Sequence, residues 1–317
     1  MVKSKKKDNA PKTINRKIYY YRIDAGVHPD TGLPRKISFG PVFTQLEAMK
    51  FDTSGRYLQT QDGKQLCCWA EKVGNTYQLR LAHIRRGQHP PVENNGKLSP
   101  LVLASGDGLA EITHLTLFPE GICGAEFNFY GPRPSQLPFY CALKLESWCP
   151  AFRLNSLIRP DLMTRLDAIT DVKLLDMKVC ASYVSVVEQA NHDLGSAFKA
   201  AIDAFDARPQ DEFEIIFKRK KNKKWAPKVS PAMLIEGVKK LALRSDLREQ
   251  VSTFKIAGGD ADARMLDILS EQFMAEHDIL LSADQTGGVD SGSMFTAIEE
   301  SYAQFKDGLE AASELKG

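Results

Sequence analysis

The sequence predicts an α+β protein built from two domains. Short runs of alternating apolar residues, bounded by Gly, Pro and Asn, recur along the chain and are typical of antiparallel strands and hairpins. Apolar residues at helical spacing separate these runs and continue over residues 290–315, which predicts a long C-terminal helix. The length of 317 residues also exceeds the roughly 100–150 residues most common for one domain. We therefore expect mixed or antiparallel sheets with packed helices, divided between two domains.

Three segments are expected along the chain. Residues 1–13 are rich in lysine and contain no apolar stretch, so they predict a flexible basic tail. Residues 14–150 are expected to form an N-terminal α+β domain, with a boundary near Cys149-Pro150. Residues 151–317 are expected to form a C-terminal α+β domain that carries a basic cluster and the final helix.

The first half alternates strands with short helices. Residues 16–24, RKIYYYRID, are aromatic and β-branched, which favours a strand. Gly74-Asn75 is a two-residue turn signal between strands at 65–73 and 76–85, and so predicts a hairpin. The other expected elements are a helix at 41–49, a second hairpin with strands at 111–118 and 122–130, a helix at 135–145 and a strand at 152–158.

The second half has a different pattern of helix starts and breaks. Ser230-Pro231 predicts the start of a helix that runs to about Leu243, because Ser caps helices and Pro suits the first helical position. Gly195 is expected to break the helical stretch 184–205, and Ser291 or Ser293 to cap the final helix. The other expected elements are a helix at 161–169 and strands at 171–180, 212–218, 253–256, 265–273 and 278–281.

Composition excludes several classes of protein. Hydrophobic residues make up 43% and charged residues 26%, so overall disorder is excluded. No apolar run approaches the 18–20 or so residues of a membrane-spanning helix, and no secretory signal follows the basic N-terminus. The six cysteines form no CxxC pair, so we expect reduced, buried thiols in a cytoplasmic protein and neither a metal nor another cofactor.

The net charge of +2 conceals two concentrated basic segments. Residues 1–17 hold seven basic residues and one acid, and residues 218–228 hold seven basic residues and no acid. The other 289 residues carry 28 basic and 39 acidic side chains, a net of −11. An acidic body with two positive clusters indicates a localised contact with a polyanion.

The second cluster is the strongest functional signal. It follows the strand FEIIF and contains ammonium groups that neutralise phosphates and release counterions. The indole of Trp225 either stacks on a base or packs under the loop. Lysine outnumbers arginine, which favours phosphate contact without sequence selection. The alternative is a solvated loop without a partner. The predicted nucleic-acid-binding residues are Lys218, Arg219, Lys220, Lys221, Lys223, Lys224, Trp225 and Lys228.

A metal-dependent nuclease is the enzymatic alternative. Pro160-Asp161 and, farther along, Asp176-Met177-Lys178 resemble the PD-(D/E)xK pattern, in which two carboxylates hold a metal and a lysine positions water. The pattern departs from that signature because Asp161 begins a helix. No other nucleophilic or acid–base motif is present, and His114 alternates within a strand as a paired core or face residue. We therefore expect no catalytic residues and no small-molecule substrate.

The final helix carries an apolar stripe at Phe295, Ile298, Tyr302, Phe305 and Leu309. Such a stripe docks a helix onto its own core or forms the seam of a homodimer. A dimer would double the basic surface and raise its avidity for a duplex.

The order of these motifs resembles the A protein of the lambda Rex phage-exclusion system. The resemblance spans about residues 16–312. Its segments are the strand at 18–22, the helix from Pro41, FYGPRPSQL at 129–137, Leu157-Ile158-Arg159, the strand with Lys173 and Lys178, FEIIFKRKKNKK, Ala297-Ile298-Glu299-Glu300 and Tyr302-Ala303.

This resemblance implies a cytoplasmic, dimeric, DNA-binding sensor in an antiphage exclusion or abortive-infection system. The sensor would activate a separate membrane effector, which only the resemblance suggests. A protein-interaction scaffold, which would leave both basic clusters unused, is the third functional class.

Overall fold

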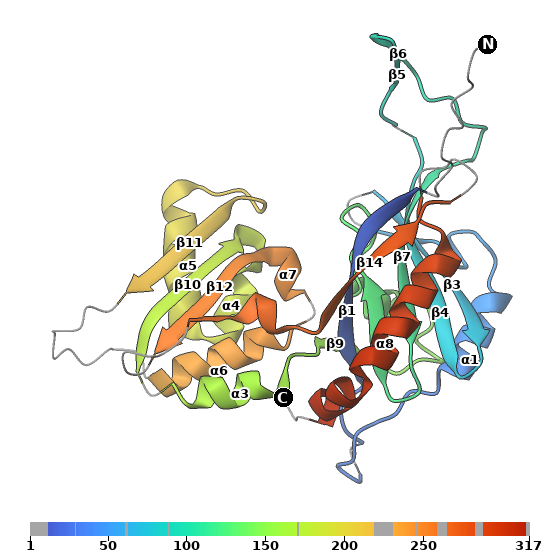
Figure 1. The fold of residues 1–317 in the computed structure, drawn as a ribbon. Helices are drawn as coiled ribbons and strands as arrows, with labels where there is room; N and C mark the ends of the chain where they lie inside the picture. The colour runs from blue at the N-terminus through green and yellow to red at the C-terminus, as the bar shows by residue number, and fades with distance from the viewer. Residues whose placement is uncertain are drawn as a thin grey trace, which may run out of the picture. The chain divides into compact units, whose positions relative to one another are not determined.

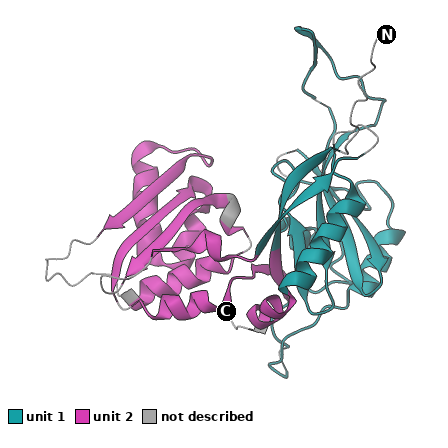
Figure 2. Ribbon diagram, viewed as in Figure 1, with its two compact units in different colours: residues 1–19, 25–151, 274–305 teal, residues 20–24, 152–273, 306–317 magenta. Residues whose placement is uncertain are grey.

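The structure, a computed structural model, describes residues 12–28, 30–60, 63–87, 89–169, 171–218, 231–244, 246–258, 265–282 and 288–314. It is an α+β protein, as predicted. Two compact units divide it (Figure 2). Unit 1 comprises residues 1–19, 25–151 and 274–305, and unit 2 comprises residues 20–24, 152–273 and 306–317. The units are discontinuous in sequence because a C-terminal segment pairs with the first strand.

Unit 1 is built on an antiparallel sheet. Its strands follow the order β14-β1-β8-β7-β4-β3-β2. Their bounds are β1 (Thr13–Asp24), β2 (Leu58–Gln59), β3 (Gln65–Val73), β4 (Thr76–Arg85), β7 (Leu109–Leu117), β8 (Ile122–Glu126) and β14 (Met274–Leu280). The hairpin of β3 and β4 is confirmed, with Gly74 at φ +57° in a turn that needs a left-handed residue. The second hairpin is also confirmed, but β8 ends at Glu126 rather than Tyr130.

Three helices accompany this sheet. They are α1 (Phe39–Ala48), α2 (Gln136–Lys144) and the long α8 (Ser291–Glu314). Figure 1 shows α8 lying across one face of the sheet. The ring of Tyr302 stacks on that of Phe118 at a centroid distance of 3.7 Å, and Glu299 accepts a hydrogen bond from Gln78. The part of the apolar stripe that lies in unit 1, with Phe295, Ile298 and Tyr302 buried, therefore docks onto this unit's own core.

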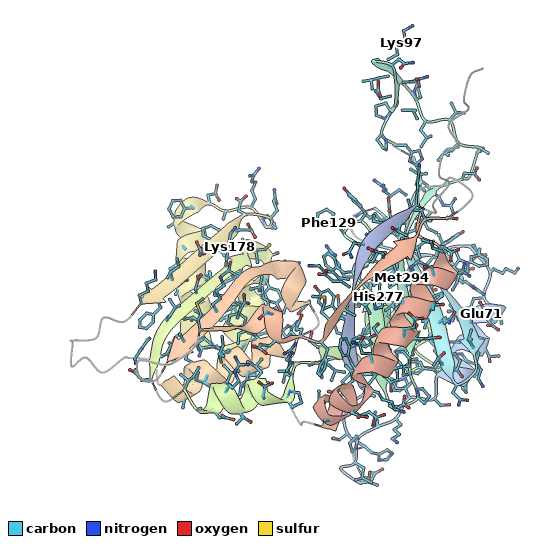
Figure 3. All side chains as sticks on the ribbon, viewed as in Figure 1. Glu71, Lys97, Phe129, Lys178, His277 and Met294 are labelled. Carbon is cyan, nitrogen blue, oxygen red and sulfur yellow. The ribbon has the colours of Figure 1, made fainter. Side chains whose placement is uncertain are left out.

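A small hairpin interrupts the segment between β4 and β7. Its strands are β5 (Val92–Asn94) and β6 (Lys97–Ser99), and every residue of both strands is exposed. Residues 87–96 are polar and contain prolines, so the sequence there predicts an exposed loop and not a hairpin. Figures 1 and 3 show the hairpin extending away from the sheet of unit 1, with Lys97 at its tip.

Unit 2 contains a four-stranded antiparallel sheet in the order β11-β10-β12-β13. The strands are β10 (Val172–Cys180), β11 (Glu212–Lys218), β12 (Val251–Gly258) and β13 (Leu266–Asp267); β9 (Arg153–Ser156) pairs with residues 21–24 of β1. The helices are α3 (Pro160–Asp167), α4 (Val184–Ala190), α5 (His192–Phe205), α6 (Pro231–Ala242) and α7 (Leu247–Gln250), with short 3₁₀ turns at Ala181–Tyr183 and Ile268–Glu271.

One hydrophobic core holds unit 2 together. Leu175, Met177 and Val179 alternate along β10 and point into it. Phe198 of α5, Leu241 of α6 and Phe254 of β12, all fully buried, fill the same core. One face of the sheet is therefore packed against helices.

Two local predictions are wrong for physical reasons. The break in residues 184–205 falls at Asn191, whose side chain accepts a hydrogen bond from the Leu194 amide and so caps α5. Gly195 lies within α5, where α4 approaches so closely that a Cβ would overlap the backbone of Glu188. The expected strand 265–273 is reduced to β13, because the side chain of Asp267 caps a 3₁₀ turn.

Candidate nucleic-acid interface

The basic cluster begins at the end of an edge strand. β11 pairs with β10 and, within the described chain, with no second strand. Lys218 is its last residue, lies opposite Leu174 of β10 and is exposed. The antiparallel pairing of β11 with β10 fixes the direction in which the chain leaves the sheet.

The rest of the predicted cluster lies outside the described residues. It belongs to residues 219–230, which connect β11 to α6. Both flanking elements belong to unit 2, and α6 begins at Pro231 as predicted. The two ends of the segment are thus attached to packed secondary structure. The members concerned are Arg219, Lys220, Lys221, Lys223, Lys224, Trp225 and Lys228.

Apolar side chains are exposed beside Lys218. Ile216 is 48% exposed and Phe217 is 41% exposed. Exposed apolar groups next to cations suit a ligand that offers both phosphates and base faces. The sequence prediction missed these two residues, because FEIIF predicts only a strand and its position at the edge of the sheet is a tertiary property.

The open face of the unit 2 sheet carries balanced charges. Lys178 lies on this face (Figure 3), where its Nζ is 2.6 Å from Glu212 Oε2. That hydrogen bond raises the pKa of Lys178 and lowers the pKa of Glu212, because each ion favours the charged form of the other. Asp176 lies opposite Lys255 of β12. Because acidic and basic side chains alternate on this face, it adds no net positive charge to the basic cluster.

The three residues of the nuclease pattern have separate surroundings. Asp161 lies in the first turn of α3, where Arg165 Nη1 is 3.2 Å from its Oδ2. Asp176 alternates with the core residues of β10, so it points away from the face on which α3 packs. Lys178 is paired with Glu212. Within the described ranges, no three His, Cys, Asp or Glu side chains form a group that could hold a metal ion.

Two further comparisons concern membrane-spanning helices and known protein families. Among the helices that the structure describes, none combines the length and the apolar character needed to cross a bilayer. No model of a known protein family matches the chain, and no curated protein matches it. The resemblance to the lambda Rex A protein stays a prediction that rests on the sequence segments that carry it.

Proposed function

We propose that this protein binds nucleic acid, duplex DNA in the first place, through residues 218–228 without selecting a sequence. The observation that carries the proposal is charge concentration: a run of seven basic residues with no acid begins at the last residue of one edge strand, and the chain outside the two basic segments is acidic. Lysine ammonium groups gain affinity from counterion release whatever the base sequence.

The position of Lys218 supports the same proposal. Lys178 of the sheet is already paired with Glu212, whereas the sequence of the cluster contains no acid to neutralise its lysines. The N-terminal lysines add a second positive segment. Exposed Ile216 and Phe217 offer apolar surface beside the first cation.

The direct test is a titration of the full chain against a labelled random-sequence duplex at several salt concentrations. A variant with Lys220, Lys221, Lys223 and Lys224 changed to Gln should bind more weakly. Its salt slope should flatten by about 0.9 for each phosphate that the variant no longer neutralises.

A matched control removes the same charge elsewhere. The control changes four exposed lysines of unit 1 to Gln: Lys36, Lys50, Lys72 and Lys97. The control variant and the cluster variant then have the same net charge. This control should keep the wild-type salt slope. Equal slopes for wild type and the cluster variant would contradict the proposal.

A magnesium arm of the same titration tests the nuclease alternative. Binding without cleavage is expected. Magnesium-dependent loss of the intact duplex that disappears in Asp176→Asn would instead make Asp176 a catalytic ligand. Binding to neither DNA nor RNA at low salt would favour the protein-interaction scaffold.

The biological role, which we propose from the resemblance alone, is a homodimeric sensor of an antiphage system with a separate membrane effector. The stripe of α8 is not available as a dimer seam, since Phe295, Ile298 and Tyr302 are buried within the chain. Dimerisation would therefore use another surface. Light scattering of the purified chain tests it, because a monomer at micromolar concentration would contradict that part.

A further inference from the structure

Three side chains form a continuous hydrogen-bonded chain inside unit 1. Ser291 Oγ lies 2.9 Å from His114 Nε2, and His114 Nδ1 lies 2.7 Å from Glu126 Oε2. His114 is 1% exposed and Glu126 is fully buried, whereas Ser291 is partly exposed. The three residues come from α8, β7 and β8, so their meeting is a product of the tertiary fold.

The chemistry of the groups sets the direction of each hydrogen bond. An ionised carboxylate only accepts, so His114 Nδ1 donates its proton to Glu126. The neutral ring then presents a lone pair on Nε2, and the hydroxyl of Ser291 donates to it. A serine hydroxyl aimed at the free lone pair of an imidazole is the arrangement that activates a nucleophilic serine.

The neighbours of His114 and Glu126 hold this geometry. Arg16 Nε of β1 lies 3.2 Å from Glu126 Oε1, which balances the buried negative charge. The backbone amide of His114 also donates to Glu126 Oε2 at 3.3 Å. The ring of Phe295 meets the imidazole edge to face at 5.2 Å and restricts its rotation.

Ser291 is the first residue of α8, where a helix has amides without intrahelical acceptors. Asp290 accepts from the amides of Ser293 and Met294. Among the described residues, the amides of Ser291 and Gly292 have no hydrogen-bond acceptor. Donors of this kind, at the positive end of a helix dipole, stabilise an oxyanion that forms next to the serine.

We propose that Ser291 is a nucleophile for carboxylic acid esters, with His114 as its general base and Glu126 as the residue that positions the imidazole. Ser291 Oγ bonds to the acyl carbon while its proton passes to His114 Nε2. The tetrahedral oxyanion collapses, the C–O bond to the alcohol breaks, and His114 returns the proton to the departing alcohol. Water then releases the carboxylic acid from Ser291 by the same proton transfers. This activity is independent of the nucleic-acid contact.

A fluorophosphonate probe on the full chain tests the proposal. Ser291 Oγ would bond to phosphorus, fluoride would leave, and His114 would take the hydroxyl proton. Peptide mapping by mass spectrometry should place the label on Ser291 in the native protein. The rate should exceed that of the urea-unfolded chain by on the order of 10²-fold or more, the range of general-base catalysis.

Two serine variants separate activation from mere reactivity. Ser291→Ala should abolish the label and the hydrolysis of p-nitrophenyl acetate. Ser293→Ala should retain both, because its hydroxyl instead accepts from the Leu280 amide. Glu126→Gln should slow labelling and displace its pH profile, a readout that a purely structural role would not move.

Three results would overturn the proposal. The first is a native protein in which Ser291 takes no label. The second is a label on Ser291 at the same rate in native and unfolded chains. The third is a label that maps to another residue. In each case the chain of Ser291, His114 and Glu126 would serve only to attach α8 to the sheet.

Discussion

One cluster of ionisable side chains is buried in unit 1, and one ion pair is exposed in unit 2, so the two can be compared. Unit 1 buries Glu126 and His114 almost completely and surrounds them with Arg16 and Ser291. Unit 2 pairs Lys178 with Glu212 on an open sheet face, where their side chains remain 36% and 38% exposed. A buried carboxylate requires several elements to supply its partners, whereas an exposed pair requires only neighbouring strands.

Solvation explains the difference. A carboxylate removed from water loses several kcal/mol of hydration, and the protein recovers this loss only when the partners are held in good geometry. Exposed pairs lose little hydration and gain at most about 1 kcal/mol. The buried chain of unit 1 is therefore sensitive to single substitutions, and the open face of unit 2 is tolerant of them.

The largest effect is expected for Glu126→Ala. It leaves Arg16 without its ion-pair partner and removes the acceptor of His114, so the free energy of unfolding should fall by about 3–5 kcal/mol. Urea denaturation measures it. The control is Glu214→Ala on exposed β11, which should change stability by less than about 0.5 kcal/mol. Equal free energies of unfolding for the two variants would contradict the expectation that the buried carboxylate contributes more to stability than the exposed one.

A smaller loss of stability is expected for Tyr183→Phe. Tyr183 is buried in unit 2, so it separates the effect of burial from the effect of the unit. Its hydroxyl donates to Asp246 Oδ1 at 2.7 Å and accepts from Arg244 Nε at 3.0 Å. Burial, with Asp246 nearby, raises the pKa of Tyr183, so the hydroxyl stays protonated. Tyr183→Phe should cost about 1.5 kcal/mol, the low end for hydrogen bonds to charged groups.

The exposed hydroxyl of Ser182 supplies the control for Tyr183→Phe. It donates to Gln250 Oε1 at 3.2 Å, and Ser182→Ala should be nearly neutral in the same urea denaturation. An unchanged free energy of unfolding in Tyr183→Phe would mean that the hydrogen bonds of the Tyr183 hydroxyl are no stronger than those it makes to water in the unfolded chain.

The ion pair of Lys178 and Glu212 should be detectable from the pKa of Glu212. The hydrogen bond from Lys178, ahead of that from Ser252, lowers the pKa of Glu212. The stability from this lowered pKa is present above the unfolded pKa and is lost as pH falls through the folded one. Lys178→Met should move the Glu212 pKa toward its ordinary value of about 4.3 in a carboxyl NMR titration.

Lys255→Met is the matched control for that titration. Lys255 faces Asp176 and not Glu212, so its removal should leave the Glu212 pKa where it is. The same Glu212 pKa in wild type and in Lys178→Met would show that the ion pair does not persist in solution.

Thiol labelling compares the burial of side chains in the two units without any substitution. Cys67, Cys68, Cys123, Cys141 and Cys149 of unit 1 are buried, whereas Cys180 of unit 2 is partly exposed. Burial raises the pKa of Cys67 to about 11. It also raises the pKa of the Cys180 thiol, so alkylation should accelerate with pH.

Iodoacetamide should modify one thiol per native chain, at Cys180, and all six after urea. Cys180→Ser should abolish the native label. Earlier labelling of Cys149, whose pKa is lowered by its hydrogen bond with Cys141, would mean that unit 1 opens more readily than its burial indicates.

Local signals in the sequence predicted most of the elements. Gly74-Asn75 set the hairpin of β3 and β4, and alternation set β10, because turn geometry and strand faces depend on neighbours in the chain. The apolar stripe of the final helix was also sufficient to predict α8. The charge asymmetry that supports the nucleic-acid proposal is likewise a property of the sequence alone.

The start of α8 shows where local signals fail. Ser291 and Ser293 are both good caps, yet Asp290 accepts the Ser293 amide and takes that role. Ser291 Oγ instead lies within hydrogen-bond distance of the ring of His114, which is 177 positions away in the sequence. No local pattern connects these residues, and His114 looked like any polar residue on a strand.

The sequence by itself determined the class of fold, the hairpins, the long helix and the two basic segments, since each depends on residues close together in the chain. Only the tertiary structure decided that Asp161 and Asp176 have separate surroundings and that β11 lies at a sheet edge. It also brought Ser291, His114 and Glu126 together. These outcomes depend on which strands pair and which helix covers them, and hence on contacts between segments that the chain order leaves far apart.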